Sequence, residues 1–410
     1  MPVKLKTAGG GSVSLQGHAS QSSDTTLTFP NGAGSNTQAL TTDGSGNLSW
    51  AAAGGGGGAP NLCINGGMRF AQRGSSVTSG TDRTYLVDRF SFRCNQGGGE
   101  TYTFTQAQSD DTPAGFTHSL KVTAPSDYVD SGYSSSGGTG YQYVAIEYRP
   151  EAYDLLATEV GTANAKDITI SFWAKSSIAG SYSLGIRHAE DSGQSYGTAY
   201  SLAANTWTKV VKTITMSTNS SLVTWETTNG VGCLIDWVLQ AEDYRDVTSA
   251  DTWLSDDKCS VGGQEDWAAT SGATFYLTGV KIEIGSSATD FHYEPYVSEL
   301  AKCERYYQTS ARGVYPSTSN HRPTIHGHYY SSSGSYWAAQ WPVPMRASPT
   351  LTLMDWDKNT GYVGQEGWEA KAVSSTTHTS HGLYHVETSG TFSSTAGYIL
   401  TANYVCDAEL

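Results

Sequence analysis

The chain has 410 residues, enough for roughly two to four domains, and a formal net charge of −14 at pH 7. This charge argues against nucleic acid as a partner, because its binders need a basic face, and against adsorption to anionic lipid. Only 15% of residues are charged, while glycine (46), tyrosine (25) and tryptophan (11) are abundant, which favours strands and turns over helices and predicts an all-β protein.

Residues 1–53 carry a sparse alternation of apolar and hydroxyl side chains, as around Val13 and Leu15, broken by turn sequences such as "PNGAGS". This pattern predicts short strands. So few apolar residues cannot form a core within one chain. Two interpretations follow, disorder or several copies that intertwine, and the periodic pattern favours the second. The five glycines that open 54–60 predict a flexible linker.

Residues 61–296 show longer alternating strands separated by Gly and Ser turns, without intervening amphipathic helices. In "DITISFWAK" one face carries the apolar residues Ile168, Ile170, Phe172 and Ala174. In "FYLTGVKIEIG" the polar residues Lys281 and Glu283 lie opposite the apolar face. The pattern predicts an antiparallel, jelly-roll-like β-sandwich.

Residues 297–410 are again strand-like and predict a small C-terminal β domain. A helix is expected over "VSELAKCERYY", with Ser298 as its N-cap. The strand pattern continues into the closing "ANYVCDAEL". We expect Tyr404 and Val405 to pack there against the domain's own sheet or against a neighbouring chain.

The six cysteines are widely spaced and form no CxxC pair, so the sequence suggests neither a zinc ribbon nor a redox motif. The chain opens Met-Pro-Val-Lys without an apolar segment, and no run approaches the ~18 apolar residues of a membrane span. We therefore expect a protein that folds in a reducing cytoplasm with free thiols and does not insert into a membrane.

Several stretches resemble segments of bacteriophage tail fibres, particularly those of phages that infect cyanobacteria and other aquatic bacteria. "SVSLQGHASQSSDTTLTFPNGAGSNTQALTTDGSGNLSW" is similar to a segment that recurs in these fibres. "NLCINGGMRFAQRG", "GTANAKDITISFWAKSS" and "FYLTGVKIEIGSSATDF" resemble a sandwich of the carbohydrate-binding-module type. "ELAKCERYYQ", "PVPMRASPT" and "ANYVCDAEL" resemble the C-terminal tip domain of such fibres.

The resemblance implies a homotrimer, made in the host cytoplasm and located in the virion tail. It implies that residues 1–53 attach to a tail or baseplate adaptor protein and that the tip, 297–410, contacts a host cell-surface glycan. Two alternatives remain open. One is a polysaccharide-degrading tailspike, and the other is a purely structural tail or baseplate component.

A tailspike enzyme would need a pair of carboxylates across a groove. The acidic clusters lie in polar, turn-like contexts, where solvated loop acids are commoner: Asp110–Asp111, Glu242–Asp246 and Asp256–Asp257. Neither a nucleophile elbow nor an HExxH motif occurs, and the repeats of a β-helix lyase are missing. We expect no catalytic residues and no enzyme.

Glycan recognition uses flat aromatic faces together with amides and carboxylates. The candidates are aromatic residues in polar contexts of the sandwich (Tyr128, Tyr133, Tyr141 and Trp173) and of the tip loop "MDWDKNTGYVGQEGW" (Trp356, Tyr362 and Trp368). The alternative for each ring is packing in the core or at a trimer interface. The tip loop is the preferred site, because three large rings stand there among polar residues.

Metal binding is suggested by "HGH", in which His326 and His328 would share one face of a strand. Neutral imidazole suits transition metals, and some related fibres place such pairs around an iron on the trimer axis. Surface histidines are the commoner outcome, so we expect no cofactor. A structural calcium ion is a further alternative, but the sequence does not identify its ligands.

Overall fold

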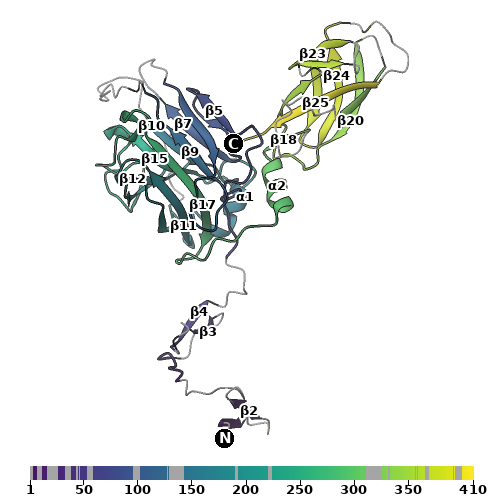
Figure 1. Ribbon diagram of the computed structural model, residues 1–410. Coiled ribbons are helices and arrows are strands. Elements are labelled where there is room, and N and C mark those ends of the chain that lie inside the picture. Colours follow the sequence, from purple (N-terminus) through teal and green to yellow (C-terminus); the bar gives the residue numbers. More distant parts are fainter. Residues whose placement is uncertain are drawn as a thin grey trace. The chain divides into compact units, whose positions relative to one another are not determined.

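The computed structural model describes residues 3–6, 12–15, 26–32, 38–42, 45, 47–52, 59–95, 102–126, 128, 143–189, 193–219, 224–310, 325–330, 333–355, 357, 359–364, 369–390, 392 and 399–410. They divide into two compact units, Met1–Ala59 and Pro60–Leu410. Both are built almost wholly from strands (Figure 1), so the prediction of an all-β protein is confirmed.

The first unit consists of two short hairpins in its described residues. β1 (Val3–Lys6) pairs with β2 (Ser12–Leu15), and β3 (Gln38–Thr42) pairs with β4 (Leu48–Ala52). Four large apolar side chains of this unit are exposed to solvent: Leu27, Phe29, Leu40 and Trp50. Isolated two-stranded hairpins are at best marginally stable, so the described part of this unit lacks a core of its own.

The second unit begins with a sandwich of two antiparallel sheets. In the described residues, seven strands form one sheet in the order β16 (Trp253–Leu254), β13 (Ser195–Leu202), β12 (Gly180–Arg187), β15 (Leu234–Ala241), β10 (Tyr143–Tyr148), β7 (Phe90–Asn95) and β6 (Thr84–Tyr85). Six described strands form the other, in the order β14 (Thr208–Thr215), β11 (Asp167–Ser176), β17 (Thr274–Ile284), β9 (Ser119–Thr123), β8 (Phe104–Ser109) and β5 (Ser76–Ser79).

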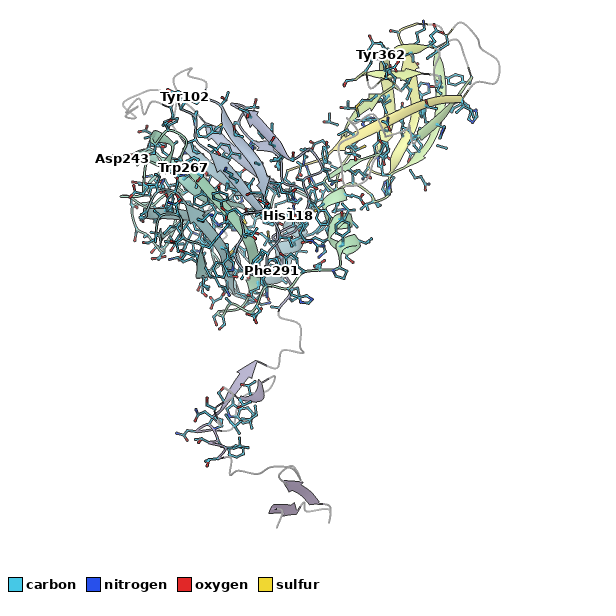
Figure 2. All side chains as sticks on the ribbon, in the orientation of Figure 1. Tyr102, His118, Asp243, Trp267, Phe291 and Tyr362 are labelled. Atoms are coloured by element: carbon cyan, nitrogen blue, oxygen red, sulfur yellow. The ribbon has the colours of Figure 1, made fainter. Side chains whose placement is uncertain are left out.

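Large aromatic rings fill the space between the two sheets. Phe172 of β11 meets Trp237 of β15 edge to face at 5.7 Å, and Trp267 (Figure 2) stacks on Phe104 at 6.5 Å. The four predicted inward residues of "DITISFWAK" are all buried. The sandwich prediction is therefore confirmed, and burial of these rings is its main source of stability.

The outer faces of the sandwich are more covered than the alternation predicts. Lys281 and Glu283 of β17 point outward, yet each side chain is only 1% exposed. The two side chains form an ion pair at 3.1 Å. The loop that follows β17 covers them, because the Thr289 N–H donates to the Glu283 carboxylate and Lys281 Nζ donates to the Asp290 carbonyl. A buried ion pair of this kind persists because its remaining bonds are satisfied.

Short helices connect the elements, namely α1 (Ala152–Leu155), η1 (Leu156–Thr158), η2 (Asp243–Arg245) and η3 (Trp267–Ala269) in the sandwich and α2 (Tyr296–Glu304) after it. The α2 helix starts two residues before the predicted N-cap Ser298. Pro295 takes the N-cap position, and the Ser298 N–H already donates to its carbonyl. Ser298 therefore lies inside the first turn of α2, so the prediction that it is the N-cap was wrong.

The C-terminal sheet has, in the described residues, the order β18 (Tyr307–Thr309), β25 (Ile399–Asp407), β19 (Ile325–Tyr329), β20 (Gly334–Gln340), β24 (Gly382–Thr388), β23 (Ala370–Thr379) and β22 (Tyr362–Gly364), with β21 (Thr350–Met354) also on β25. β22 pairs back onto β25 through Gly364 and Thr401. This pairing closes the sheet into a small barrel-like body.

The closing strand β25 is held within its own chain. Tyr404 packs on Trp341 at 4.8 Å, and Val405 packs with Tyr307 and Met354. After the strand, Glu409 forms an ion pair with the fully buried Arg89 of the sandwich. Tyr404 and Val405 therefore pack against the domain's own sheet, which is one of the two environments predicted for them.

All six cysteines are free thiols and all are buried. Burial raises the pKa of the Cys259 thiol to about 12. Burial also raises the pKa of the thiols of Cys63, Cys233, Cys303 and Cys406. In the described residues, no helix combines the length and the apolar character needed to cross a membrane.

Candidate functional site

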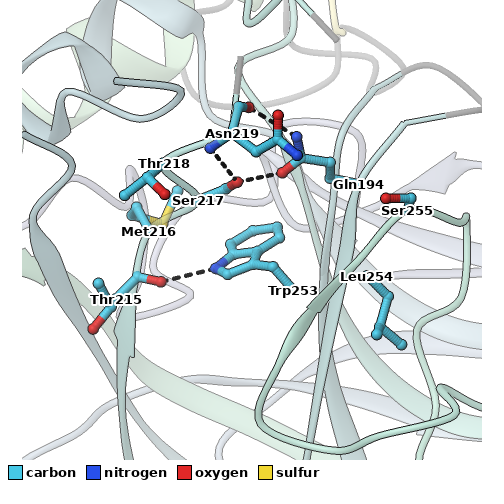
Figure 3. Close-up of a pocket in the computed structure, with 9 residues that line it drawn as sticks. All are labelled: Gln194, Thr215, Met216, Ser217, Thr218, Asn219, Trp253, Leu254 and Ser255. Atoms are coloured by element: carbon cyan, nitrogen blue, oxygen red, sulfur yellow. Dashed lines mark hydrogen bonds between the residues drawn. The ribbon is translucent and has the colours of Figure 1, made fainter. Parts of the chain in front are cut away.

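A pocket opens at the edge of the seven-stranded sheet, beside the two-residue strand β16 (Figure 3). Its volume is about 260 Å³. Three segments line the pocket. They are Gln194, which precedes β13; Thr215 at the end of β14 with Met216, Ser217, Thr218 and Asn219 after it; and Trp253 and Leu254 of β16 with Ser255 after them. This volume lies just below the usual range for drug-sized ligands, so the pocket suits a ligand of about one sugar ring.

The indole of Trp253 is fixed in one orientation. Its Nε1–H donates to the Thr215 carbonyl at 2.8 Å, across the pocket in Figure 3. The ring packs on Tyr196 at 5.5 Å and meets Trp225 edge to face at 6.0 Å. Trp225 in turn meets His188 edge to face at 5.0 Å. An aromatic ring held from behind and half-exposed at a pocket is suited to stacking on a ligand.

A network of polar groups faces this indole. Gln194 is buried, and its Nε2 donates to the Asn219 carbonyl at 2.8 Å while its Oε1 accepts from the Ser217 hydroxyl. The Asn219 N–H donates to the same hydroxyl at 3.2 Å. Thr218 and Asn219 have exposed side chains at the mouth. An apolar ring beside a few fixed amide and hydroxyl groups is the composition expected of a sugar site.

The sequence alone did not predict this pocket. Trp253 and Asn219 are 34 residues apart in sequence, and Gln194 precedes another strand. The only local signal was "DTWL", a tryptophan within an acidic turn segment. Their proximity results from the pairing of Tyr196 with Trp253 and of Ser195 with Leu254, which periodicity alone does not predict.

The predicted aromatic residues of the sandwich do not gather in this pocket. Tyr128 is half-buried and packs on Tyr102 at 4.8 Å, at the edge of the core. Tyr133 and Tyr141 lie outside the described residues. Trp173 is half-buried on the outer face of β11. Their part in glycan binding stays a prediction.

The crowded surroundings of Trp173 depend on a glycine. Gly279 has φ +63°, and a Cβ there would lie 2.6 Å from Phe116 and 3.1 Å from Trp173. Both rings therefore approach the backbone of β17 closely. Phe116 also contacts Phe291 and Tyr293 at 5.1 and 5.9 Å.

Of the predicted tip residues, the structure describes Tyr362, which opens β22 with its side chain 39% exposed (Figure 2). Trp356 and Trp368 lie outside the described residues. His326 and His328 are both exposed on one face of β19, as predicted for residues two apart in a strand. No group of three or more His, Cys, Asp or Glu side chains in the described residues is placed to hold a metal.

An exposed aromatic stack lies on the outer face of the C-terminal sheet. Tyr330 and Tyr336 are 52% and 62% exposed, and their rings stack with centroids 4.3 Å apart. The Tyr330 hydroxyl lies 2.9 Å from His385 Nε2. His328, Tyr336 and His385 are cross-strand partners on β19, β20 and β24. These rings are exposed aromatic residues of the C-terminal sheet that the sequence did not single out.

Two carboxylates face each other across neighbouring strands, but both are buried. Glu147 of β10 pairs in register with Asp236 of β15. Arg187 bonds to Asp236 at 2.8 Å and lies 3.7 Å from Glu147. Both carboxylates have no solvent-exposed surface. Substrate cannot reach them in this conformation, so the pair acts in the ion network of the sheet.

Several residues of the acidic clusters in the loops have protein partners. Asp111 pairs with Lys175, Asp257 bridges Arg187 and Arg245, and Asp246 accepts from Ser260 Oγ. These contacts hold loops onto the sandwich. Asp246 and Asp257 are half-buried, whereas Asp110, Asp111 and Asp243 are exposed, as expected of loop acids.

Comparison with known proteins gives no family assignment: no protein-family description and no curated protein matches. Among solved structures, the enzymatically active domain of tailspike protein 4 from bacteriophage CBA120 matches at 12% identity and a TM-score of 0.27, over 55% of this chain and 21% of that chain. A xylan-binding CBM22-1 domain from Paenibacillus barcinonensis matches at 11% and 0.24, over 53% and 99% of the chains.

A family 11 carbohydrate-binding module from Clostridium thermocellum is similar to the same extent, with 11% identity and a TM-score of 0.24, over 53% of this chain and 98% of the module. At such identities and TM-scores these matches carry no weight in assigning a function. The assignment depends on the residues described above.

Proposed function

We propose that this chain is a non-enzymatic glycan-binding attachment protein, a homotrimeric phage tail fibre that recognises sugars on the host surface. The observation that carries the proposal is the pocket at Trp253, in which a fixed indole faces a buried amide and exposed hydroxyl and amide side chains. This combination offers an apolar face to a sugar ring and polar groups to its hydroxyls.

The role in a fibre is supported by the first unit and by the sequence resemblance. The exposed Leu27, Phe29, Leu40 and Trp50 side chains would be covered if three copies intertwined. In such a fibre residues 1–53 attach to a tail or baseplate adaptor, and the protein is located in the virion. Light scattering of the full-length chain counts the copies, and a stable monomer would contradict the fibre.

The burial and the ion pairing of the carboxylates described above support binding without cleavage. Glu147 and Asp236 are inaccessible beneath arginines, and Asp111 and Asp257 are engaged in ion pairs. A glycosidase needs two accessible carboxyl groups on opposite sides of the scissile bond. Incubation with host polysaccharide should therefore release no new reducing ends, whereas a tailspike enzyme would release them.

The test of the pocket is a Trp253→Ala variant of the full-length protein. We expect the wild-type protein to bind one or more neutral oligosaccharides on a glycan array, and the variant to lose at least tenfold in affinity by calorimetry, about 1.4 kcal/mol. Trp253→Phe, which keeps an aromatic face, should retain part of the affinity.

A second variant separates binding from folding, because Trp253 also packs against the core. Thr218→Ala alters only an exposed side chain at the pocket and leaves the Gln194–Ser217–Asn219 hydrogen bonds intact. It should keep the wild-type melting temperature and bind more weakly. Unchanged binding in both variants would leave the pocket without a role, and binding to no glycan would favour a structural tail component.

A further inference from the structure

The outer face of the six-stranded sheet concentrates lysines and aromatic rings in a protein whose net charge is −14. One row of cross-strand partners runs from Lys175 on β11 to Tyr276 on β17 and Lys121 on β9. Trp207 directly precedes β14, whose Thr208 pairs with Ala174. Lys209 pairs with Trp173 in the neighbouring row. We refer to Trp207, Lys175, Tyr276, Lys121 and Lys209 as the lysine–aromatic face.

The rings and ammonium groups of this face are held together. Lys175 Nζ lies 4.5 Å from the centre of the Tyr276 ring and 5.2 Å from that of Trp207. The two rings meet at 6.0 Å, nearly edge to face. Lys121 Nζ lies 5.6 Å from Tyr276 on its other side. The rings are half-buried, so each keeps part of its surface accessible to a ligand.

The local charge is positive at two places. Asp111 neutralises Lys175 and accepts from Trp207 Nε1 at 3.1 Å. Among the described residues neither Lys121 nor Lys209 forms an ion pair, although the charge of Lys121 also helps to lower the pKa of Asp111, after the hydrogen bonds from Lys175 and Trp207 and the charge of Lys175. Asp110 is exposed next to Asp111 and is the nearest further acid in sequence. Two ammonium groups beside aromatic rings therefore remain available for an anionic ligand.

The size of the face indicates a chain of several sugar rings. β14 and β9 are separated by β11 and β17, and Lys209 and Lys121 lie in neighbouring rows. Three inter-strand spacings and a two-residue offset along the strands place their backbones roughly 16 Å apart. A single carboxylate cannot reach both lysines. A polysaccharide with a carboxylate on successive rings can contact both and stack a ring on Trp207 or Tyr276.

We propose that the lysine–aromatic face is a second binding site, separate from the Trp253 pocket, that takes an acidic polysaccharide built from uronic acids. Lys121 and Lys209 contact carboxylates, and Trp207 and Tyr276 stack on the rings. The site extends the proposed glycan-binding function to a charged class of surface polymer.

The test measures binding of an unesterified galacturonate oligosaccharide to the full-length protein by calorimetry. Its methyl ester, which has the same rings without the charge, serves as the matched ligand. We expect the free acid to bind more tightly than the ester and to weaken as salt is added. Lys121→Gln with Lys209→Gln should weaken binding of the acid roughly tenfold and change binding of the ester little.

Lys212→Gln with Lys258→Gln is the charge-matched control. Lys212 is on the same strand as Lys209, but its side chain belongs to the opposite face of β14, which alternates toward the core. Lys258 lies in the loop after β16. This variant should bind like the wild type. Equal loss in both variants would reduce the effect to net charge and overturn the site.

Other outcomes also decide the question. Equal affinity for acid and ester, or no binding of the galacturonate oligosaccharide to the wild type, would overturn the proposal. If Trp253→Ala abolished binding of the acid while the lysine variant did not, the second site would be refuted and the proposed function would stand.

Discussion

At the residue scale, the clearest electrostatic device is the cluster around Glu147. Burial alone would raise the pKa of this carboxyl group, but Arg93, Arg149 and Arg187 outweigh it and lower the pKa to about 2. Arg93 and Arg149 donate to Glu147 at 2.8 and 2.7 Å. A buried carboxylate among several guanidinium groups locks the outer face of β10 to its neighbours.

This cluster predicts a specific pH dependence for Glu147→Gln. The folded pKa lies below the unfolded value of ~4.3, so the stability from Glu147 is complete above that pH and is lost as the pH falls towards 2. The variant should cost about 3–5 kcal/mol at pH 7, because it leaves buried arginines without their carboxylate. In urea unfolding, the difference from wild type should shrink at pH 3.

The control is Glu159→Gln, which removes an exposed ion pair with Lys166. It should change the free energy of unfolding by less than about 1 kcal/mol at either pH. A Glu147→Gln penalty of the same size at pH 7 and pH 3 would show that the charge of Glu147 contributes nothing.

At the element scale, β25 shows how the last strand is secured. It pairs with β18, β19, β21 and β22, and the residues after it reach the sandwich. Glu409 contacts Arg89 and Arg73, Arg346 donates to the Ala408 and Glu409 carbonyls, and the Tyr85 hydroxyl donates to the Leu410 carbonyl. The strand is thus clamped at its end by side chains from distant parts of the chain.

We therefore expect Glu409→Gln to destabilise the Pro60–Leu410 unit by about 3–5 kcal/mol, because the fully buried Arg89 loses its carboxylate. Asp407→Asn is the matched control, since Asp407 contacts Arg73 but is 42% exposed. It should cost less than about 1 kcal/mol. Equal melting temperatures for the two variants would mean that the clamp at Glu409 is unimportant.

The strands themselves could be predicted because their signal is local. Alternation in "DITISFWAK" predicts the inward residues of β11 correctly, and "HGH" predicts a strand that exposes both histidines. The covering of Lys281 and Glu283 could not be predicted, because it depends on a loop that folds back over β17. The Trp253 pocket could not be predicted either, because its residues are distant in sequence and are brought together by strand pairing.

At the scale of the whole molecule, the described residues offer several aromatic and polar surfaces. The Trp253 pocket and the lysine–aromatic face lie on the sandwich, and the Tyr330–Tyr336 stack lies on the C-terminal sheet. Shallow sites bind sugars weakly when alone. If the chain forms the proposed trimeric fibre, three copies per fibre and several fibres per virion would convert weak contacts into lasting adhesion through effective concentration.

The exposed Tyr330–Tyr336 stack is also consistent with the predicted role of the tip in receptor contact. The predicted loop itself, with Trp356 and Trp368, lies outside the described residues. Large rings kept at a surface usually contact a partner. In a fibre, that partner is either the host glycan or a neighbouring copy of the chain.

The most direct test of attachment is adsorption competition. If the chain is the proposed tail fibre, host bacteria are incubated with saturating purified full-length protein, a phage whose fibre contains this chain is added, and unadsorbed phage are counted. We predict that the wild-type protein blocks adsorption and that Trp253→Ala, at the same concentration and with an intact fold, blocks it much less. Adsorption equal to that on untreated cells, at a concentration of wild-type protein that saturates, would contradict the account.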